Sequence, residues 1–244
     1  SDQPDSEGKR ARGKTALPRA LLHISCMMVP SSFVTGIRPE ETNVLHTVPP
    51  LKPMNTDPIT THVALLRGVN VGGKNRLPMR DLALMFEDAG CTAVDTYIQS
   101  GNVVFQAEAS LAARIPALST REIDDRFGYR VPVVTRTAED LREVVRENPF
   151  LRAGVDQVRL HVAFLAQVPD DLRVADLEPQ RSPPDLFQVR GRDIFLHCPD
   201  GVARTKLTNA YFDSKLATTS TVRNWRTVTA LLEMADRHLP ANEE

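Results

Sequence analysis

The chain of 244 residues has few cysteines and no long apolar run. Its three cysteines, Cys26, Cys91 and Cys198, lie far apart and form no CxxC pair, so neither a disulfide framework nor a zinc site is predicted. No apolar segment approaches the roughly 18 residues that a membrane helix needs. Residues 21–30 are too short for such a helix and lack a convincing cleavage pattern for a signal peptide. We therefore expect a cytoplasmic protein without a bound metal ion, a cofactor or a membrane contact.

The chain also lacks a dominant charge of one sign. Thirty Lys and Arg residues nearly balance 31 Asp and Glu residues, which gives a net charge of −1. A near-neutral protein has no broad basic field, so bulk charge does not favour a nucleic-acid partner. Hydrophobic residues make up 41% of the chain, which is enough for a core in one large or two small domains.

Residues 1–60 lack the hydrophobic periodicity of a folded segment. They contain eight prolines and a basic cluster at residues 9–14, separated by Ser, Thr and Asn. Such a composition buries too little apolar surface to offset chain entropy, so residues 1–60 are predicted to be a disordered N-terminal extension. Met54 is typical of a natural start, which would make residues 1–53 an upstream extension and a start-site artefact. The alternative is a basic tail that contacts a partner.

The most informative stretch is residues 62–78, which read HVALLRGVNVGGKNRLP. A short apolar strand at residues 63–67 leads into a glycine-rich loop, and a helix is predicted from Pro78 to about residue 89. Backbone amides and cations that converge in such a loop can hold an anion. The candidate anion ligands in this stretch are Arg67, Asn70, Gly72, Gly73 and Lys74. The alternative is a tight glycine turn whose cations are solvated.

The same loop nearly matches the phosphate-binding pattern G-x-x-x-x-G-K-[ST] of nucleoside triphosphatases. Asn75 stands where that pattern has the hydroxyl that binds magnesium, and the helix starts about three residues later than the pattern requires. We therefore expect a looser anion site and no nucleoside-triphosphatase loop.

The predicted elements follow the order of a ferredoxin-like fold. After the first strand and helix, residues 94–99 and 102–106 form a hairpin around Ser100-Gly101, and a helical region leads to a strand at 131–135. This order is βαββαβ. A similar order follows, with a strand at 158–166, a hairpin at 186–197 and helices at about 207–216 and 223–237. We predict an α+β protein with two ferredoxin-like (βαββα) halves and C-terminal helices, in which the halves cover residues 61–150 and 151–240.

Two further loops supply candidate ligands. Ser100 and Asn102 lie at the tip of the first predicted hairpin, where they would add neutral hydrogen-bonding groups to the anion site. Arg204 and Lys206 precede a predicted helix, where cations oppose the helix dipole and a bound anion would offset that repulsion. Both places have a simpler alternative, since a hairpin turn explains Ser100-Gly101 and cations beside helix caps are common on surfaces.

Other polar residues are predicted to have structural or solvated positions. His161 alternates away from the core residues of its strand and is expected to face solvent, as is Arg223. Trp225, the only tryptophan, is expected to anchor the last helix by packing. His197 and Cys198 are neighbours on a strand and point to opposite faces, so they do not form a catalytic pair. Because no general base is identified, the sequence assigns no enzymatic activity.

Five separated segments follow one another in the chain: ALLRGVNVGGKNRLPM, TYIQSGNVVF, VPVVTRTAEDLREVVRENPF, ARTKLTN and TVRNW. Together they resemble the domain of unknown function 1697 family, over residues from about His62 to Ala235, with residues 1–60 outside. The resemblance implies a bacterial α+β protein with ferredoxin-like halves, and the family has no established activity. Thr205 stands where the family has a serine, a change that keeps the hydroxyl.

We predict that the protein binds a phosphorylated or otherwise anionic small molecule through these loops. One alternative is a nucleic-acid-binding module, although the central strands lack the aromatic pair that stacks bases in ferredoxin-like RNA-binding domains. The other alternative is a non-enzymatic interaction protein. The sequence predicts no oligomeric state.

Overall fold

A computed structural model describes residues 57–238 of the chain. The predicted N-terminal extension, up to residue 56, lies outside the described residues. Strand β1, Ile59–Leu66, begins before the predicted boundary at residue 60 and before the strand predicted from residue 63. Its first two residues pair through their backbones with residues 107–108, while their side chains are exposed. Thr60, Thr61 and His62 separate Ile59 from the apolar run that begins at Val63, which is why the sequence placed the start of the strand too late.

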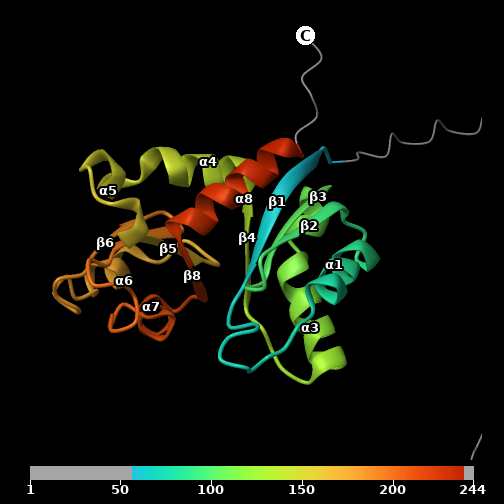
Figure 1. Ribbon diagram of the computed structural model, residues 1–244, viewed down its shortest axis with the longest axis horizontal. Helices are drawn as coiled ribbons and strands as arrows, with labels where there is room; N and C mark the ends of the chain where they lie inside the picture. The colour runs from blue at the N-terminus through green and yellow to red at the C-terminus, as the bar shows by residue number, and fades with distance from the viewer. Residues whose placement is uncertain (1–56, 239–244) are drawn as a thin grey trace, which may run out of the picture. The chain divides into compact units, whose positions relative to one another are not determined.

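The first half of the described chain, from β1 to α4, contains the predicted βαββαβ order. Its further elements are α1 Met79–Asp88, β2 Thr92–Tyr97, β3 Asn102–Glu108, α2 Ala109–Ala112, α3 Ile115–Phe127, β4 Val133–Thr137 and α4 Ala138–Glu147. The sheet has the order β2-β3-β1-β4, and each neighbouring pair is antiparallel. This is the strand order that the split βαβ plan produces, as Figure 1 shows.

The second half, from β5 to α8, repeats this arrangement after two short helices, α5 Pro149–Arg152 and η1 Gln157–Arg159. Its elements are β5 Leu160–Leu165, α6 Asp171–Ala175, β6 Leu186–Arg190, β7 Asp193–His197, α7 Asn209–Leu216, β8 Ser220–Asn224 and α8 Trp225–Arg237. The sheet order is β6-β7-β5-β8, again antiparallel throughout. The prediction of an α+β fold with two ferredoxin-like halves is confirmed.

Strand β8 is the element that the sequence analysis missed. Its residues, STVRN, carry no apolar alternation, and we predicted a helix from residue 223 instead. The segment is extended because it pairs with β5 along its whole length, from His161↔Asn224 to Leu165↔Ser220. The last helix therefore begins at Trp225, with the Asn224 side chain accepting a hydrogen bond from the Thr227 amide at 2.8 Å.

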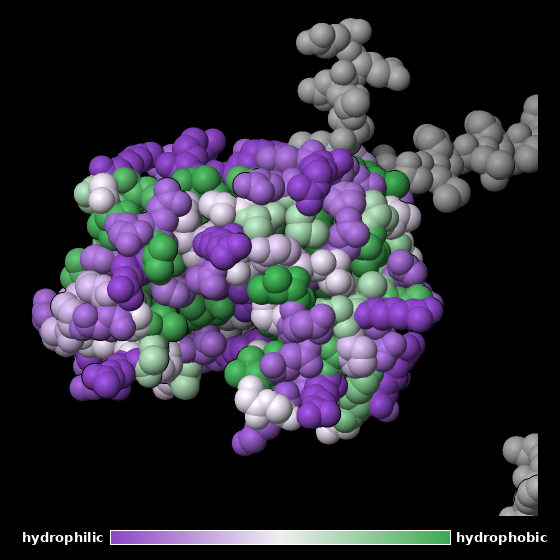
Figure 2. Space-filling model, viewed as in Figure 1, coloured by the Kyte–Doolittle hydropathy of each residue, from purple (hydrophilic) through white to green (hydrophobic). Residues whose placement is uncertain are grey.

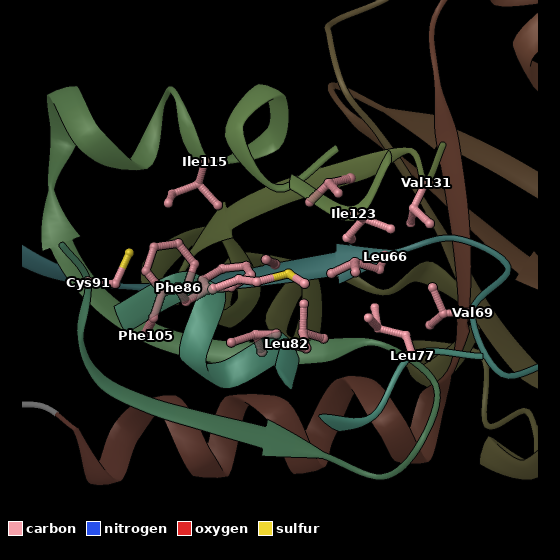
Figure 3. Close-up of a cluster of buried hydrophobic side chains, with 14 of the residues drawn as sticks. Leu66, Val69, Leu77, Leu82, Phe86, Cys91, Phe105, Ile115, Ile123 and Val131 are labelled. Carbon is pink, nitrogen blue, oxygen red and sulfur yellow. The ribbon is translucent and has the colours of Figure 1, made fainter. Parts of the chain in front are cut away.

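Hydrophobic side chains cover both faces of each sheet. One cluster fills the space between the first sheet and helices α1 and α3, where Leu66, Phe86 and Phe105 converge (Figure 3). A second cluster lies between the second sheet and α7 and includes Leu165 and Phe212. A third, which we call the central core, joins both sheets to α4 and α8 and includes Val63, Leu65, Val104, Leu141, Phe164, Phe195, Trp225 and Leu231. Helices α4 and α8 lie side by side across it (Figure 1).

The predicted exposure of His161 is wrong. The residue lies on β5, both of whose faces are buried, and it retains 8% of its accessible surface. When both faces of a strand are buried, alternate side chains enter two different cores, so the alternation does not distinguish buried residues from exposed ones. Burial lowers the pKa of His161 below its ordinary value, and its Nδ1 is buried without a hydrogen-bond partner.

Two buried arginines connect the halves. Arg136, on β4, extends from the first half to the end of β5 and to the β6–β7 hairpin. It donates hydrogen bonds to the carbonyl oxygens of Leu165 at 2.9 Å and Arg192 at 2.6 Å, and it forms an ion pair with Asp193 at 2.9 Å. Burial alone would lower the pKa of Arg136, and the Asp193 carboxylate opposes that shift.

Arg223, on β8, makes the reciprocal contact, so its predicted exposure is also wrong. It donates to the carbonyl oxygens of Leu66 at 2.6 Å and Gly101 at 3.3 Å, and to Oδ1 of Asn102 at 2.6 Å. The strand registers of the two sheets match. These acceptors are therefore the counterparts of Leu165, Arg192 and Asp193, which surround Arg136. Because the carboxylate is replaced by an amide, burial lowers the pKa of Arg223 to about 10.

Polar and apolar side chains are interspersed on the surface that Figure 2 shows. Within residues 57–238, no helix combines the length and the apolar character that a membrane crossing requires.

Replacing Arg136 by Ala is expected to lower the free energy of unfolding by about 3–5 kcal/mol, because Asp193 would remain buried without its partner. Replacing both residues, as Arg136→Met with Asp193→Leu, should lower it less. Urea unfolding followed by circular dichroism measures both values. Equal losses in the single and double variants would contradict this role of the ion pair.

The buried histidine makes stability depend on pH. A base whose folded pKa is lowered binds more protons in the unfolded state, so stability falls as pH drops below the unfolded value of about 6.5. Between about pH 7.5 and pH 5.5, the parent protein should lose more unfolding free energy than His161→Phe. Parallel urea titrations at the two pH values test this, and equal losses in the two proteins would refute it.

Candidate functional site

Asn70 holds the loop between β1 and α1 in its shape. Its backbone has a positive φ of 55°, and its side-chain carbonyl accepts from the Leu77 amide at 2.8 Å. Its side-chain amide donates to the carbonyl oxygens of Leu77 and Gln99, both at 2.8 Å. The side chain thus closes the loop and fastens it to the β2–β3 hairpin, so its hydrogen bonds serve the structure of the loop.

The tip of this loop is a turn centred on two glycines. Gly72 and Gly73 have positive φ values of 58° and 75°, the conformation that favours glycine at both central positions of a two-residue turn. The Lys74 amide donates to the Val71 carbonyl at 3.1 Å, and the Lys74 side chain is exposed. This geometry matches the alternative of a tight glycine turn with a solvated cation.

Arg67 links the end of β1 to the second half. It forms an ion pair with Asp213 of α7 at 2.5 Å and donates to the Ser220 carbonyl at 2.9 Å. Asp213 also accepts from the amide and the hydroxyl of Ser220, at 2.7 Å and 2.6 Å. The charge of Arg67 is therefore already balanced within the protein.

Ser100 and Asn102 belong to the network around Arg223. Asn102 is fully buried, and its side-chain amide donates to Ser100 Oγ at 2.9 Å and to the Tyr97 carbonyl at 3.1 Å. Its carbonyl oxygen accepts from Arg223. Of the predicted ligands, Arg67, Asn70, Ser100 and Asn102 thus have partners inside the protein, while the side chains of Lys74, Arg204 and Lys206 form no ion pair among residues 57–238.

Lys206 lines a pocket of about 570 Å³ that runs along α7 from its N-cap Thr208 to Lys215 in its last turn, and we call it the α7 pocket. The loop residues Asn70 and Gly73 line a separate pocket of about 350 Å³. The residues that line the α7 pocket are Glu178, Arg181, Thr205, Lys206, Thr208, Ala210, Tyr211, Ser214 and Lys215. Arg204, although near in sequence, is not among these lining residues.

Local hydrogen bonds fix the segment that carries Lys206. Thr208 caps α7, since its hydroxyl oxygen accepts from the Tyr211 amide at 3.2 Å. The Thr205 hydroxyl oxygen accepts from the Leu207 amide at 3.1 Å, and the Lys206 amide donates to Ser182 Oγ at 2.9 Å. These contacts hold two hydroxyls and the base of the lysine side chain at the pocket wall.

The α7 pocket has an excess of positive charge. Arg181 lies over the ring of Tyr211 at 4.9 Å, and Lys215 is 3.7 Å from Glu178, which also pairs with Arg181 at 3.5 Å. Glu178 pairs with two of the cations, and the third, Lys206, forms no ion pair within residues 57–238, so the pocket has three cations and one carboxylate. The sequence analysis missed Arg181, Glu178 and Lys215, because no spacing near Lys206 in the sequence indicates them.

The described cysteines are not nucleophiles in this structure. Cys91 and Cys198 are both buried, and burial raises the pKa of each thiol to about 11. At neutral pH the thiols are protonated, and the thiolate is the reactive form.

The sheet surfaces that ferredoxin-like RNA-binding modules present are covered in this protein. Val63 and Val104 of the first sheet, and Phe164 of the second, face the central core beneath α4 and α8. A strand surface buried under helices cannot stack bases. This arrangement weighs against the nucleic-acid alternative in its usual form.

The two sheets and their order define an α+β protein of two ferredoxin-like halves. The chain belongs to the family described as Protein of unknown function (DUF1697), whose model matches residues 59–195. It is similar in structure to the conserved bacterial protein SP0830 from Streptococcus pneumoniae, with 22% sequence identity and a TM-score of 0.55. That similarity covers 73% of this chain and 99% of the other, and at this identity it shows the fold alone. No curated protein matches the chain.

Replacing Asn70 by Ala should lower the free energy of unfolding by roughly 1–3 kcal/mol, because three backbone groups lose a partner and Ala is disfavoured at positive φ. Lys74→Ala is the matched control from the same loop and should change stability by less than about 0.5 kcal/mol. Urea unfolding of both variants provides the comparison. A neutral Asn70→Ala would show that the loop does not depend on this side chain.

Proposed function

We propose that this protein binds a small anionic molecule with a phosphate-type group, and that the α7 pocket is its binding site. The observation that carries the proposal is the cluster of Arg181, Lys206 and Lys215 around a pocket with a single carboxylate, Glu178. Guanidinium and ammonium groups are the usual partners of phosphate oxygens, by charge-assisted hydrogen bonds.

The position of the cluster supports the same proposal. Cations at the N-terminal end of a helix oppose its dipole, so Lys206 destabilises α7 unless an anion lies between them. Thr205, the N-cap residue Thr208 and Ala210 of the first turn line the same pocket. An anion there would interact with both the side chains and the helix dipole.

The proposal revises the predicted site. It keeps Lys206 and assigns structural roles to Arg67, Asn70, Ser100 and Asn102, as their contacts indicate. It also separates Lys74 from Lys206, since their loops line different pockets. We further propose that the protein acts in a reducing compartment such as the cytoplasm, where the buried thiols of Cys91 and Cys198 stay free.

Binding of inorganic pyrophosphate by the full chain tests the proposal. Titration calorimetry at constant ionic strength should show binding to the parent protein, and Lys206→Ala should raise the dissociation constant about tenfold or more. Lys74→Ala serves as the control, because it removes an equal charge from the other loop and should bind like the parent.

Two outcomes would overturn the proposal. The first is pyrophosphate binding that Lys74→Ala weakens and Lys206→Ala leaves unchanged, which would return the site to the glycine-rich loop. The second is that the parent protein binds no pyrophosphate at any pyrophosphate concentration whose salt contribution leaves the thermal unfolding of the protein unchanged.

A further inference from the structure

The repeated fold permits a comparison of the protein with itself. Arg136 and Arg223 occupy equivalent strand positions, and Thr137 and Asn224 cap the equivalent helices α4 and α8. Residues of α4 and α8 therefore correspond at a constant separation along the chain, as do residues of the β2–β3 and β6–β7 hairpins beside the arginines. Places where the two halves differ are visible in this comparison.

One such place lies between the last helix of one half and the hairpin of the other. It occurs twice, between α8 and the β2–β3 hairpin and between α4 and the β6–β7 hairpin. Beside α8, it contains Tyr97, Leu231 and Met234, which pack in or against the central core. The counterparts of these residues beside α4 are Arg190, Val144 and Glu147. There the structure has a pocket of about 390 Å³, which we call the α4 pocket. The apolar residues beside α8 are thus replaced beside α4 by an open, charged pocket.

The charged groups of the α4 pocket are mostly paired with one another. Arg192 is 3.0 Å from Asp140, Arg190 is 3.3 Å from Glu147, and Asp193 pairs with the buried Arg136. Burial raises the pKa of Asp193, although Arg136 opposes this shift.

Glu143 lines the pocket but forms no ion pair among residues 57–238. The pocket therefore has one exposed, unpaired carboxylate in addition to two guanidinium groups that each have a carboxylate partner. Apolar side chains of Val144, Val168 and Phe195 complete its wall.

The Arg190–Glu147 and Arg192–Asp140 pairs of the pocket are each about one-third exposed, and ion pairs at that exposure contribute little to folding. At the equivalent place beside α8, Tyr97 and Met234 pack against the central core where the α4 pocket has charges. Pockets that combine an apolar wall with a few convergent polar groups are typical of small-molecule sites. The combination here has carboxylates, guanidinium groups and an apolar wall in one cavity.

We propose that the α4 pocket binds a free α-amino acid with an apolar side chain. A guanidinium group of Arg190 or Arg192 would bind the carboxylate of the ligand, and Glu143 with Asp193 would bind its ammonium group. Val144, Val168 and Phe195 would contact its side chain. The net charge of such a ligand is zero, so it differs in chemistry from the anion proposed for the α7 pocket.

Three probes separate the parts of this recognition: L-leucine, 3-methylbutylamine, which lacks the carboxylate, and 4-methylpentanoate, which lacks the ammonium group. Titration calorimetry on the full chain should give a dissociation constant on the order of 0.1 mM for L-leucine. Each of the other two probes should bind about tenfold more weakly, because one charged group of the pocket then has no ligand partner.

Glu143→Gln should weaken L-leucine about tenfold and leave 4-methylpentanoate unchanged. Glu139→Gln is the matched control, since Glu139 is exposed on the same helix and does not line the pocket. A second variant, Arg190→Tyr with Glu147→Met, copies the residues beside α8 and should abolish binding with its thermal unfolding temperature retained. Lys206→Ala should not change L-leucine binding.

The proposal is overturned if L-leucine binds no more tightly than the two analogues. It is also overturned if Glu143→Gln and Glu139→Gln have equal effects, or if the variant that copies the residues beside α8 folds and still binds L-leucine. Absence of L-leucine binding to a folded parent protein would equally refute it.

Discussion

The reciprocal contacts of Arg136 and Arg223 are the constraint on which the rest of this structure depends. Each guanidinium crosses from the last strand of one half to the first strand and the hairpin of the other. Burying these charges is unfavourable unless every donor finds an acceptor, and here the acceptors are backbone oxygens together with Asp193 or Asn102. The two sheets are therefore fixed relative to one another, and the central core closes between them under α4 and α8.

Both proposed sites lie where the two halves differ. Helix α3 has 13 residues, whereas its counterpart α7 has eight, and the α7 pocket runs along this shorter helix. At the α4 pocket, Arg190 and Glu147 stand where Tyr97 and Met234 stand beside α8. In a duplicated fold the shared positions maintain the architecture, and the differing positions are the ones available for binding.

The sequence predicted the order of the elements well, since hydrophobic period and turn residues are local signals. It missed β8 and misplaced His161 and Arg223, because each of these depends on a partner that is distant in the chain. It selected Asn70 and Asn102 by residue type, but type does not distinguish an asparagine that binds a ligand from one that supports a loop. Glu143 and Glu147 share a helix face with Val144, and charges beside a buried position are the signal that could have indicated the α4 pocket.

Native-state hydrogen exchange tests most directly whether the arginine contacts unite the two halves. If they do, amides of β1 and β5 exchange through the same global opening, with equal free energies and equal denaturant dependence. A variant that combines Arg136→Met, Asp193→Leu and Arg223→Met should then lower the free energy of exchange of both strands together. Exchange of β5 at a free energy well below that of β1 would contradict this role of the arginines, because it would show that the second half opens while the first half remains folded.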